Sequence, residues 1–143
     1  MFKKSITTNK HCLYLDLDTV CFKNIDFICK LPAGFYGIRD FYHLNILQTG
    51  ILKWEVNDES VRLYKNNLHH IDKYFNKGDH ELIGECVKTP LFLQDIFPGE
   101  ICSYKKHMAQ LYKNYITPSI VCFHGNPRPR TIKHDLIAKH WKY

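Results

Sequence analysis

The chain has 143 residues, 45% of them hydrophobic and 24% charged, a composition typical of one folded domain and not of a disordered segment. The formal net charge of +6 favours an anionic partner, but no nucleic-acid-binding motif accompanies it, so we expect no nucleic acid to bind. No apolar run is long enough to span a bilayer. Residues 5–11 are polar where a secretory signal would be apolar, so we expect a cytoplasmic protein. Its six cysteines are expected to be buried thiols that form neither disulfides nor a zinc site.

The first half of the chain reads as strands with one short helix between them. Residues 11–17 form a near-continuous apolar run, which is typical of a central strand covered on both faces. The helix is expected to begin near Asn24, a possible cap, and to end at Pro32. Two further strands are predicted at 34–41 and 47–54.

The second half alternates helices with strands. Apolar residues spaced by three and four positions predict an amphipathic helix over 61–75, and Asp79 can cap a short helix over 80–87. Two prolines make 126–130 irregular. The remaining predicted elements are a short strand within 99–107, a helix at 107–115, a strand at 119–123 and a helix at 135–140. This alternation predicts an α/β protein with a mixed sheet flanked by helices.

The first motif with chemical potential is Asp16-Leu17-Asp18, at the end of the first apolar run. On a strand, residues two apart point the same way, so both carboxylates could address one point beyond the strand end. Two such oxygen ligands suit Mg²⁺ or Mn²⁺, which in turn binds a diphosphate. The alternative is a strand end whose aspartates only face solvent.

The second motif lies in the sequence VCFHGNPRP, residues 121–129. Here a histidine could complete a metal site, a glycine lets backbone N–H groups approach a phosphate, and an arginine binds phosphate oxygens with two donors. These residues are His124, Gly125 and Arg128. The alternative is an ordinary turn with a hydrogen-bonded histidine. Two weaker motifs are Gln48-Thr49-Gly50 within a strand and Asp79-His80 at a helix start.

In this order along the chain, the four motifs resemble those of GT-A-type glycosyltransferases. The similar proteins are the glycogenin-like and bacterial lipopolysaccharide galactosyltransferases and phage-type sugar transferases. The resemblance implies a GT-A-like fold and a metal-dependent transfer of sugar from a nucleotide-sugar donor, a UDP-sugar, to a glycan or lipopolysaccharide-type acceptor. It also implies one truncated domain over 1–143, with the D-x-D strand at 11–18 and the C-terminal loop at 121–130, lacking the family's N-terminal nucleotide-binding half.

Carried over residue by residue, the resemblance implies that Asp16, Asp18 and His124 bind Mn²⁺ or Mg²⁺. Asp79 would act beside the anomeric carbon, by orienting the acceptor or stabilising positive charge there. The implied donor- and substrate-binding residues are Gln48, Thr49, Gly50, His80, Gly125 and Arg128.

Four positions depart from the family pattern. The family commonly has asparagine, glutamine and lysine where this chain has Gln48, His80 and Arg128. Its metal-binding histidine commonly lies three residues before the glycine, where this chain has Cys122. The assignment of His124 therefore depends on its lying on the same strand face, two residues later.

Two other functions remain open from the sequence. In a haloacid-dehalogenase-type phosphatase, Asp16 would be the phosphoryl-accepting nucleophile and Asp18 the general acid or base. Against it, Thr19-Val20 follows where that family favours glycine and threonine, and the 121–129 loop has no role in it. The third possibility is a basic remnant that binds a nucleotide-sugar or another anion without turnover.

Overall fold

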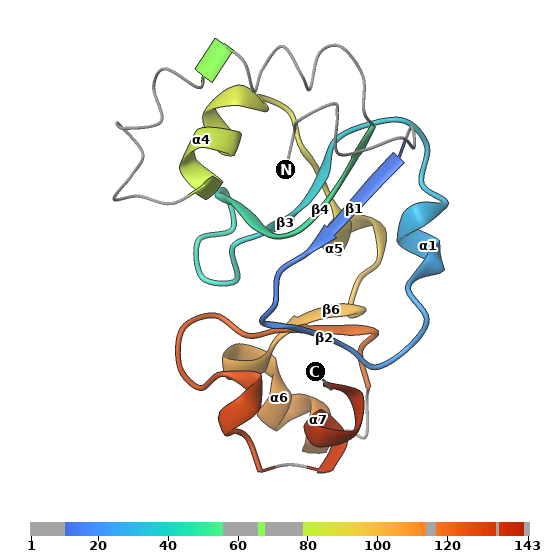
Figure 1. The fold of residues 1–143 in the computed structure, drawn as a ribbon, viewed down its shortest axis with the longest axis vertical. Helices are drawn as coiled ribbons and strands as arrows, with labels where there is room; N and C mark the ends of the chain where they lie inside the picture. Colours follow the sequence, from blue (N-terminus) through green and yellow to red (C-terminus); the bar gives the residue numbers. More distant parts are fainter. Residues whose placement is uncertain (1–10, 56–65, 68–78, 114–116, 134, 142–143) are drawn as a thin grey trace.

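A computed structural model describes residues 11–55, 66–67, 79–113, 117–133 and 135–141 of the chain (Figure 1). It is a mixed α/β structure, as the alternating pattern predicts, but its strands form two separate sheets. None of the helices in these ranges is long and apolar enough to cross a membrane.

The first sheet has four strands in the order β1-β4-β3-β5. The long strand β4 pairs antiparallel with β1 on one side and with β3 on the other, and β3 pairs parallel with β5. The bounds are β1 His11–Leu15, β3 Tyr36–Arg39, β4 Leu47–Glu55 and β5 Leu91–Phe92.

The strand β1 lies at the edge of this sheet, so the prediction of a central strand is wrong. It ends at Leu15, and Leu17, which the apolar run included, is 85% exposed. The run is apolar because each face of β1 meets a different part of the core. Leu13 and Leu15 pack against one hydrophobic cluster, whereas Cys12 and Tyr14 pack against another. An edge strand covered on both faces has the same hydrophobic pattern as a central one.

The second sheet has three strands in the order β2-β7-β6. The strand β7 pairs antiparallel with β2 and parallel with β6. The bounds are β2 Thr19–Cys21, β6 Ile101–Ser103 and β7 Ile120–Cys122. Because β1 and β2 belong to different sheets, the chain crosses from one sheet to the other at residues 16–18, the D-x-D motif (Figure 1).

The helices are mostly short. Their bounds are α1 Asp26–Cys29, α4 Asp79–Cys86, α5 Leu93–Ile96, α6 Tyr104–Lys113, the 3-10 turn η3 Pro129–Thr131 and α7 Asp135–His140. The last helix matches its prediction, whereas α6 begins three residues before the predicted 107. The stretch expected to be irregular contains η3, because proline is tolerated in the first turn of a helix. The predicted helix over 61–75 lies largely outside the described residues.

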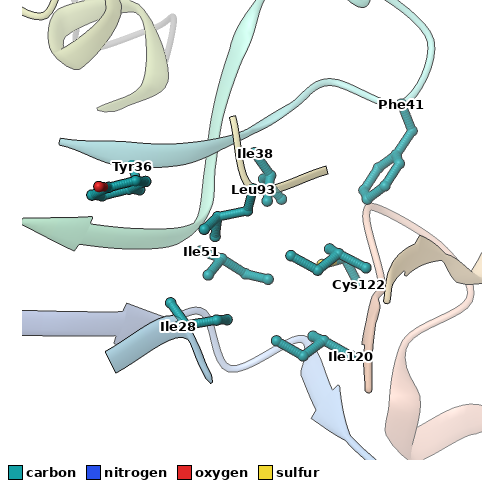
Figure 2. Packing of buried hydrophobic residues seen from close by; sticks show 9 residues of the cluster. Ile28, Tyr36, Ile38, Phe41, Ile51, Leu93, Ile120 and Cys122 are labelled. Carbon is teal, nitrogen blue, oxygen red and sulfur yellow. The ribbon is translucent and has the colours of Figure 1, made fainter. Parts of the chain in front are cut away.

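One hydrophobic cluster joins the two sheets (Figure 2). Tyr36, Ile38 and Ile51 enter it from the first sheet, and Ile120 and Cys122 from the second, all of them at most 4% exposed. The two sheets therefore share buried apolar surface, which holds the crossing segment between them in place.

The six cysteines are free thiols, as predicted, but the expectation that they are buried is right for only two of them. Cys102 and Cys122 are buried, and burial raises the pKa of Cys122 to about 12, so its thiol stays protonated. Cys29 is exposed.

Lys53, on the central strand β4, is a basic residue inside the hydrophobic core and is only 1% exposed. Its ammonium donates hydrogen bonds to the carbonyl oxygens of Leu31 (3.2 Å) and Pro32 (2.6 Å), and it lies 4.9 Å from the centre of the Tyr36 ring. Lys53 thereby attaches the 31–32 segment to the sheet. The two carbonyl groups and the face of the Tyr36 ring take the place of water around its ammonium group.

We predict that Lys53→Ala lowers the free energy of unfolding by about 2–4 kcal/mol, because it leaves a cavity and removes the donor from two carbonyl groups. Urea denaturation would measure the change, with the exposed Lys133→Ala as the control. Equal denaturation midpoints for the two variants would contradict a structural role for Lys53.

Candidate functional site

The two aspartates of the D-x-D motif lie in a tight turn and not on a strand. The amide of Thr19 donates to the carbonyl oxygen of Asp16 (3.0 Å), which closes the turn around the exposed Leu17. The Asp16 side chain is exposed and accepts a hydrogen bond from the Leu17 amide (2.8 Å). The expected common direction of the two carboxylates, which depended on strand alternation, therefore does not follow from this backbone.

The Asp18 carboxylate forms an ion pair with Arg128. The Asp18 side chain is 18% exposed and that of Arg128 is 44% exposed, so the pair lies at the edge of the core. The backbone joins the same two segments, because the amide of Phe123 donates to the carbonyl oxygen of Asp18 (2.8 Å). The structure thus brings two predicted site residues together that are more than a hundred positions apart in the sequence.

A third predicted segment meets the same turn. The carbonyl oxygen of Gly50 accepts a hydrogen bond from the amide of Asp16 (2.9 Å) and a long one from the hydroxyl of Thr19 (3.5 Å). Thr49 beside it is buried and Gln48 is half-buried. A Cβ atom at Gly50 would make only ordinary contacts of 3.6 Å, so crowding does not explain this glycine.

His124 faces different partners. Its Nε2 lies 2.7 Å from the hydroxyl oxygen of Ser103, and its ring stacks on Phe41 with the ring centres 5.8 Å apart. Since the Ser103 oxygen also accepts a hydrogen bond from the amide of Lys106 (3.2 Å), the hydroxyl proton is free to go to His124. Burial, and then the nearby Lys105, lower the pKa of His124, which keeps the ring neutral near pH 7.

A three-residue metal site is not preformed here. Within the ranges that the structure describes, no group of three or more His, Cys, Asp or Glu side chains is placed to hold a metal ion. Asp18 is paired with Arg128, and the Nε2 of His124 meets Ser103. Asp16 fits a Mg²⁺ or Mn²⁺ ion that takes its other ligands from water and substrate phosphates, as Mg²⁺ commonly does. Asp18 fits such an ion only after it exchanges Arg128.

The motif Asp79-His80 lies elsewhere, at the start of α4. His80 lines a hollow of about 510 Å³ beside Ile46, Leu47 and Phe92. The side chain of Asp79 is outside the described part of the structure.

Two residues at this site were missed by the sequence analysis. Ser103 orients His124, and its own amide donates to Nδ1 of His107 (3.0 Å). Lys105 lies against Gly125, whose φ of +69° is in the left-handed region that favours glycine. Both residues lie where α6 begins, with Ser103 directly before its first residue, Tyr104, and Lys105 in its first turn. A predicted helix start at 104 in place of 107 would have pointed to both.

Comparisons with known proteins do not identify the chain. No family model matches the sequence, and no curated protein matches it significantly.

The Asp18–Arg128 pair should be measurable as a coupling energy. We predict that Asp18→Asn and Arg128→Met each destabilise the protein and that the double variant loses about 1 kcal/mol less than the sum of the two, because each single change leaves a partly buried charge unpaired. Urea denaturation of the four proteins gives the cycle. The exposed Arg130→Met is the matched control, and strict additivity would show that the pair contributes nothing.

A second prediction concerns pH. The pKa values of His124 and His107 are both lowered, by burial and then by the lysines at 105 and 106. The unfolded chain therefore binds protons more readily, and stability should fall as pH drops from about 7.5 to about 5.5. The pKa of Glu100 is lowered as well, chiefly by a hydrogen bond from Ser119, so Glu100 also removes stability as pH drops, but in a lower pH range than the histidines.

Chemical denaturation at several pH values should show a smaller acid loss of stability in His124→Gln than in the wild type. His43→Gln, at an exposed loop position, is the control. An identical pH dependence in His124→Gln and the wild type would mean that protonation of His124 does not oppose folding.

Proposed function

We propose that this chain is a glycosyltransferase of the GT-A type that binds the diphosphate of a nucleotide-sugar beside the D-x-D turn. The observation that carries the proposal is the meeting of Asp18 with Arg128, since the resemblance places both on the same donor diphosphate. Gly50 at the same turn supports it, because the Gln48–Gly50 segment is the implied neighbour of the donor sugar. The proposed donor is a UDP-sugar, and the proposed acceptor is a glycan or a lipopolysaccharide-type saccharide.

In this proposal, Asp16 and Asp18 hold a divalent ion against the donor diphosphate. When bound, the ion supplies Lewis-acid neutralisation of the departing nucleoside diphosphate. Because Asp16 is the one exposed carboxylate of the D-x-D turn, the ion should bind weakly without nucleotide and more tightly with it. Binding of the ion by Asp18 requires Arg128, whose side chain is 44% exposed, to turn away from its carboxylate.

The other proposed residues keep the roles that the resemblance implies. Gly125 offers its backbone amide to a phosphate oxygen, which stabilises negative charge on the leaving group. Asp79 orients the acceptor or stabilises positive charge at the anomeric carbon, and His80 lies next to it on α4. The hollow beside His80 is the proposed acceptor side of the site.

The test is UDP release from UDP-sugars in the presence of Mn²⁺ and simple glycoside acceptors. We predict release with at least one donor, and Asp16→Asn should slow it roughly a hundredfold, because the ion loses its exposed carboxylate. Asp135→Asn, an exposed carboxylate at the start of α7, is the matched control and should leave the rate unchanged. Mn²⁺ and UDP together should raise the melting temperature more than either alone.

Three outcomes would contradict the proposal in different ways. Stabilisation by Mn²⁺ and UDP without turnover would identify a nucleotide-binding remnant. Phosphate release from a phosphomonoester, abolished in Asp16→Asn, would identify the phosphatase. An absence of both binding and turnover would remove the site altogether.

A further inference from the structure

Arg128 alone does not supply the positive charge that a diphosphate needs. Its guanidinium is already paired with Asp18, and Asp16 adds a second carboxylate on the same turn. These three side chains together carry a net charge of −1, which repels an anion that arrives without its metal. A further cation near the loop that carries Arg128 is needed if the protein itself is to attract the phosphates.

Lys105 is such a cation. It is exposed, and its ammonium nitrogen lies 3.3 Å from the point where a Cβ atom on Gly125 would stand. It is also close enough to His124 to lower the pKa of that ring. Lys105 therefore lies over the loop that joins β7 to Arg128.

The neighbouring Lys106 already has partners within the protein. Lys106 donates from its ammonium to the carbonyl oxygen of Phe41 (2.5 Å) and lies 5.6 Å from the ring centre of Tyr42. Lys105 forms no ion pair with any residue of the described ranges, and its ammonium nitrogen lies close to Gly125, where a Cβ atom would be 3.3 Å away. The ammonium thus stands beside a backbone that a phosphate oxygen can approach closely.

We propose that Lys105 is the main cation that binds the diphosphate of the donor, and that Arg128, which holds Asp18 in the turn while the site is empty, contributes less to this binding. This inference rests on the proposed function for the identity of the anion, but the anion site itself does not require sugar transfer. Its ligand class is a diphosphate, bound through charge-assisted hydrogen bonds from the Lys105 ammonium and the Gly125 amide.

The test measures binding of inorganic pyrophosphate and of UDP by calorimetry, each with and without Mn²⁺. Lys105→Met should weaken both affinities roughly ten- to hundredfold, the usual effect of removing a charged hydrogen-bond donor, whereas Lys105→Arg should retain most of the affinity. The melting temperature of Lys105→Met should stay close to that of the wild type, since the exposed side chain forms no described ion pair. Lys113→Met is the matched control, an exposed lysine eight residues further along the same helix.

Arg128 should behave differently in the same assay. Arg128→Met should weaken binding of metal-free pyrophosphate less than Lys105→Met does, yet lower stability more, and Arg128→Lys should recover part of that stability. If Arg128→Met abolishes pyrophosphate binding while Lys105→Met does not, the two roles are reversed and the inference is wrong.

The outcomes separate this inference from the proposed function. Pyrophosphate binding that depends on Lys105, without turnover of any UDP-sugar, supports the anion site and contradicts the transferase. Equal affinities in Lys105→Met and the wild type overturn the role of Lys105 and leave the transferase standing. No binding of pyrophosphate or UDP by the wild type, with or without Mn²⁺, contradicts both.

Discussion

Two backbone hydrogen bonds hold the D-x-D turn to both sheets, and the rest of the site depends on them. The amide of Asp16 donates to Gly50 on β4, and the carbonyl of Asp18 accepts from Phe123 at the end of β7. The turn is therefore part of the framework, fixed at both ends, although Leu17 between the aspartates is almost fully exposed. The shared core beneath it keeps the two sheets from moving apart.

The electrostatics of the turn follow from this position. Desolvation of a carboxylate is costly unless a positive group meets it. Asp18 is mostly covered and is met by Arg128, whereas Asp16 stays in water and needs no partner from the chain. The two aspartates therefore differ both in solvent exposure and in pairing. The carboxylate of Asp16 is exposed to solvent, whereas that of Asp18 is already paired with the guanidinium of Arg128.

The loop after β7 begins with a partly buried residue, His124, and continues with exposed residues. His124 is held by Ser103 and Phe41, which anchors the loop where it leaves the strand. One residue later, the left-handed Gly125 turns the chain outward towards Arg128. This division explains how His124 is hydrogen-bonded to Ser103 and partly buried, while the adjacent residues remain at the surface.

Local patterns in the sequence determined the α/β class, the extent of β4 and α7, the free thiols and the two charged motifs. These features depend on periodicity, glycine, proline and residue type, which act over a few positions. Only the tertiary structure decided that β1 is an edge strand, that the D-x-D motif is a turn between sheets, and that Arg128 pairs with Asp18 while His124 pairs with Ser103. An apolar run indicates that both faces of a strand are buried, but it does not indicate which strands pair with it. Ion pairs and hydrogen bonds between residues a hundred positions apart depend on how the two sheets pack, and no local spacing contains that information.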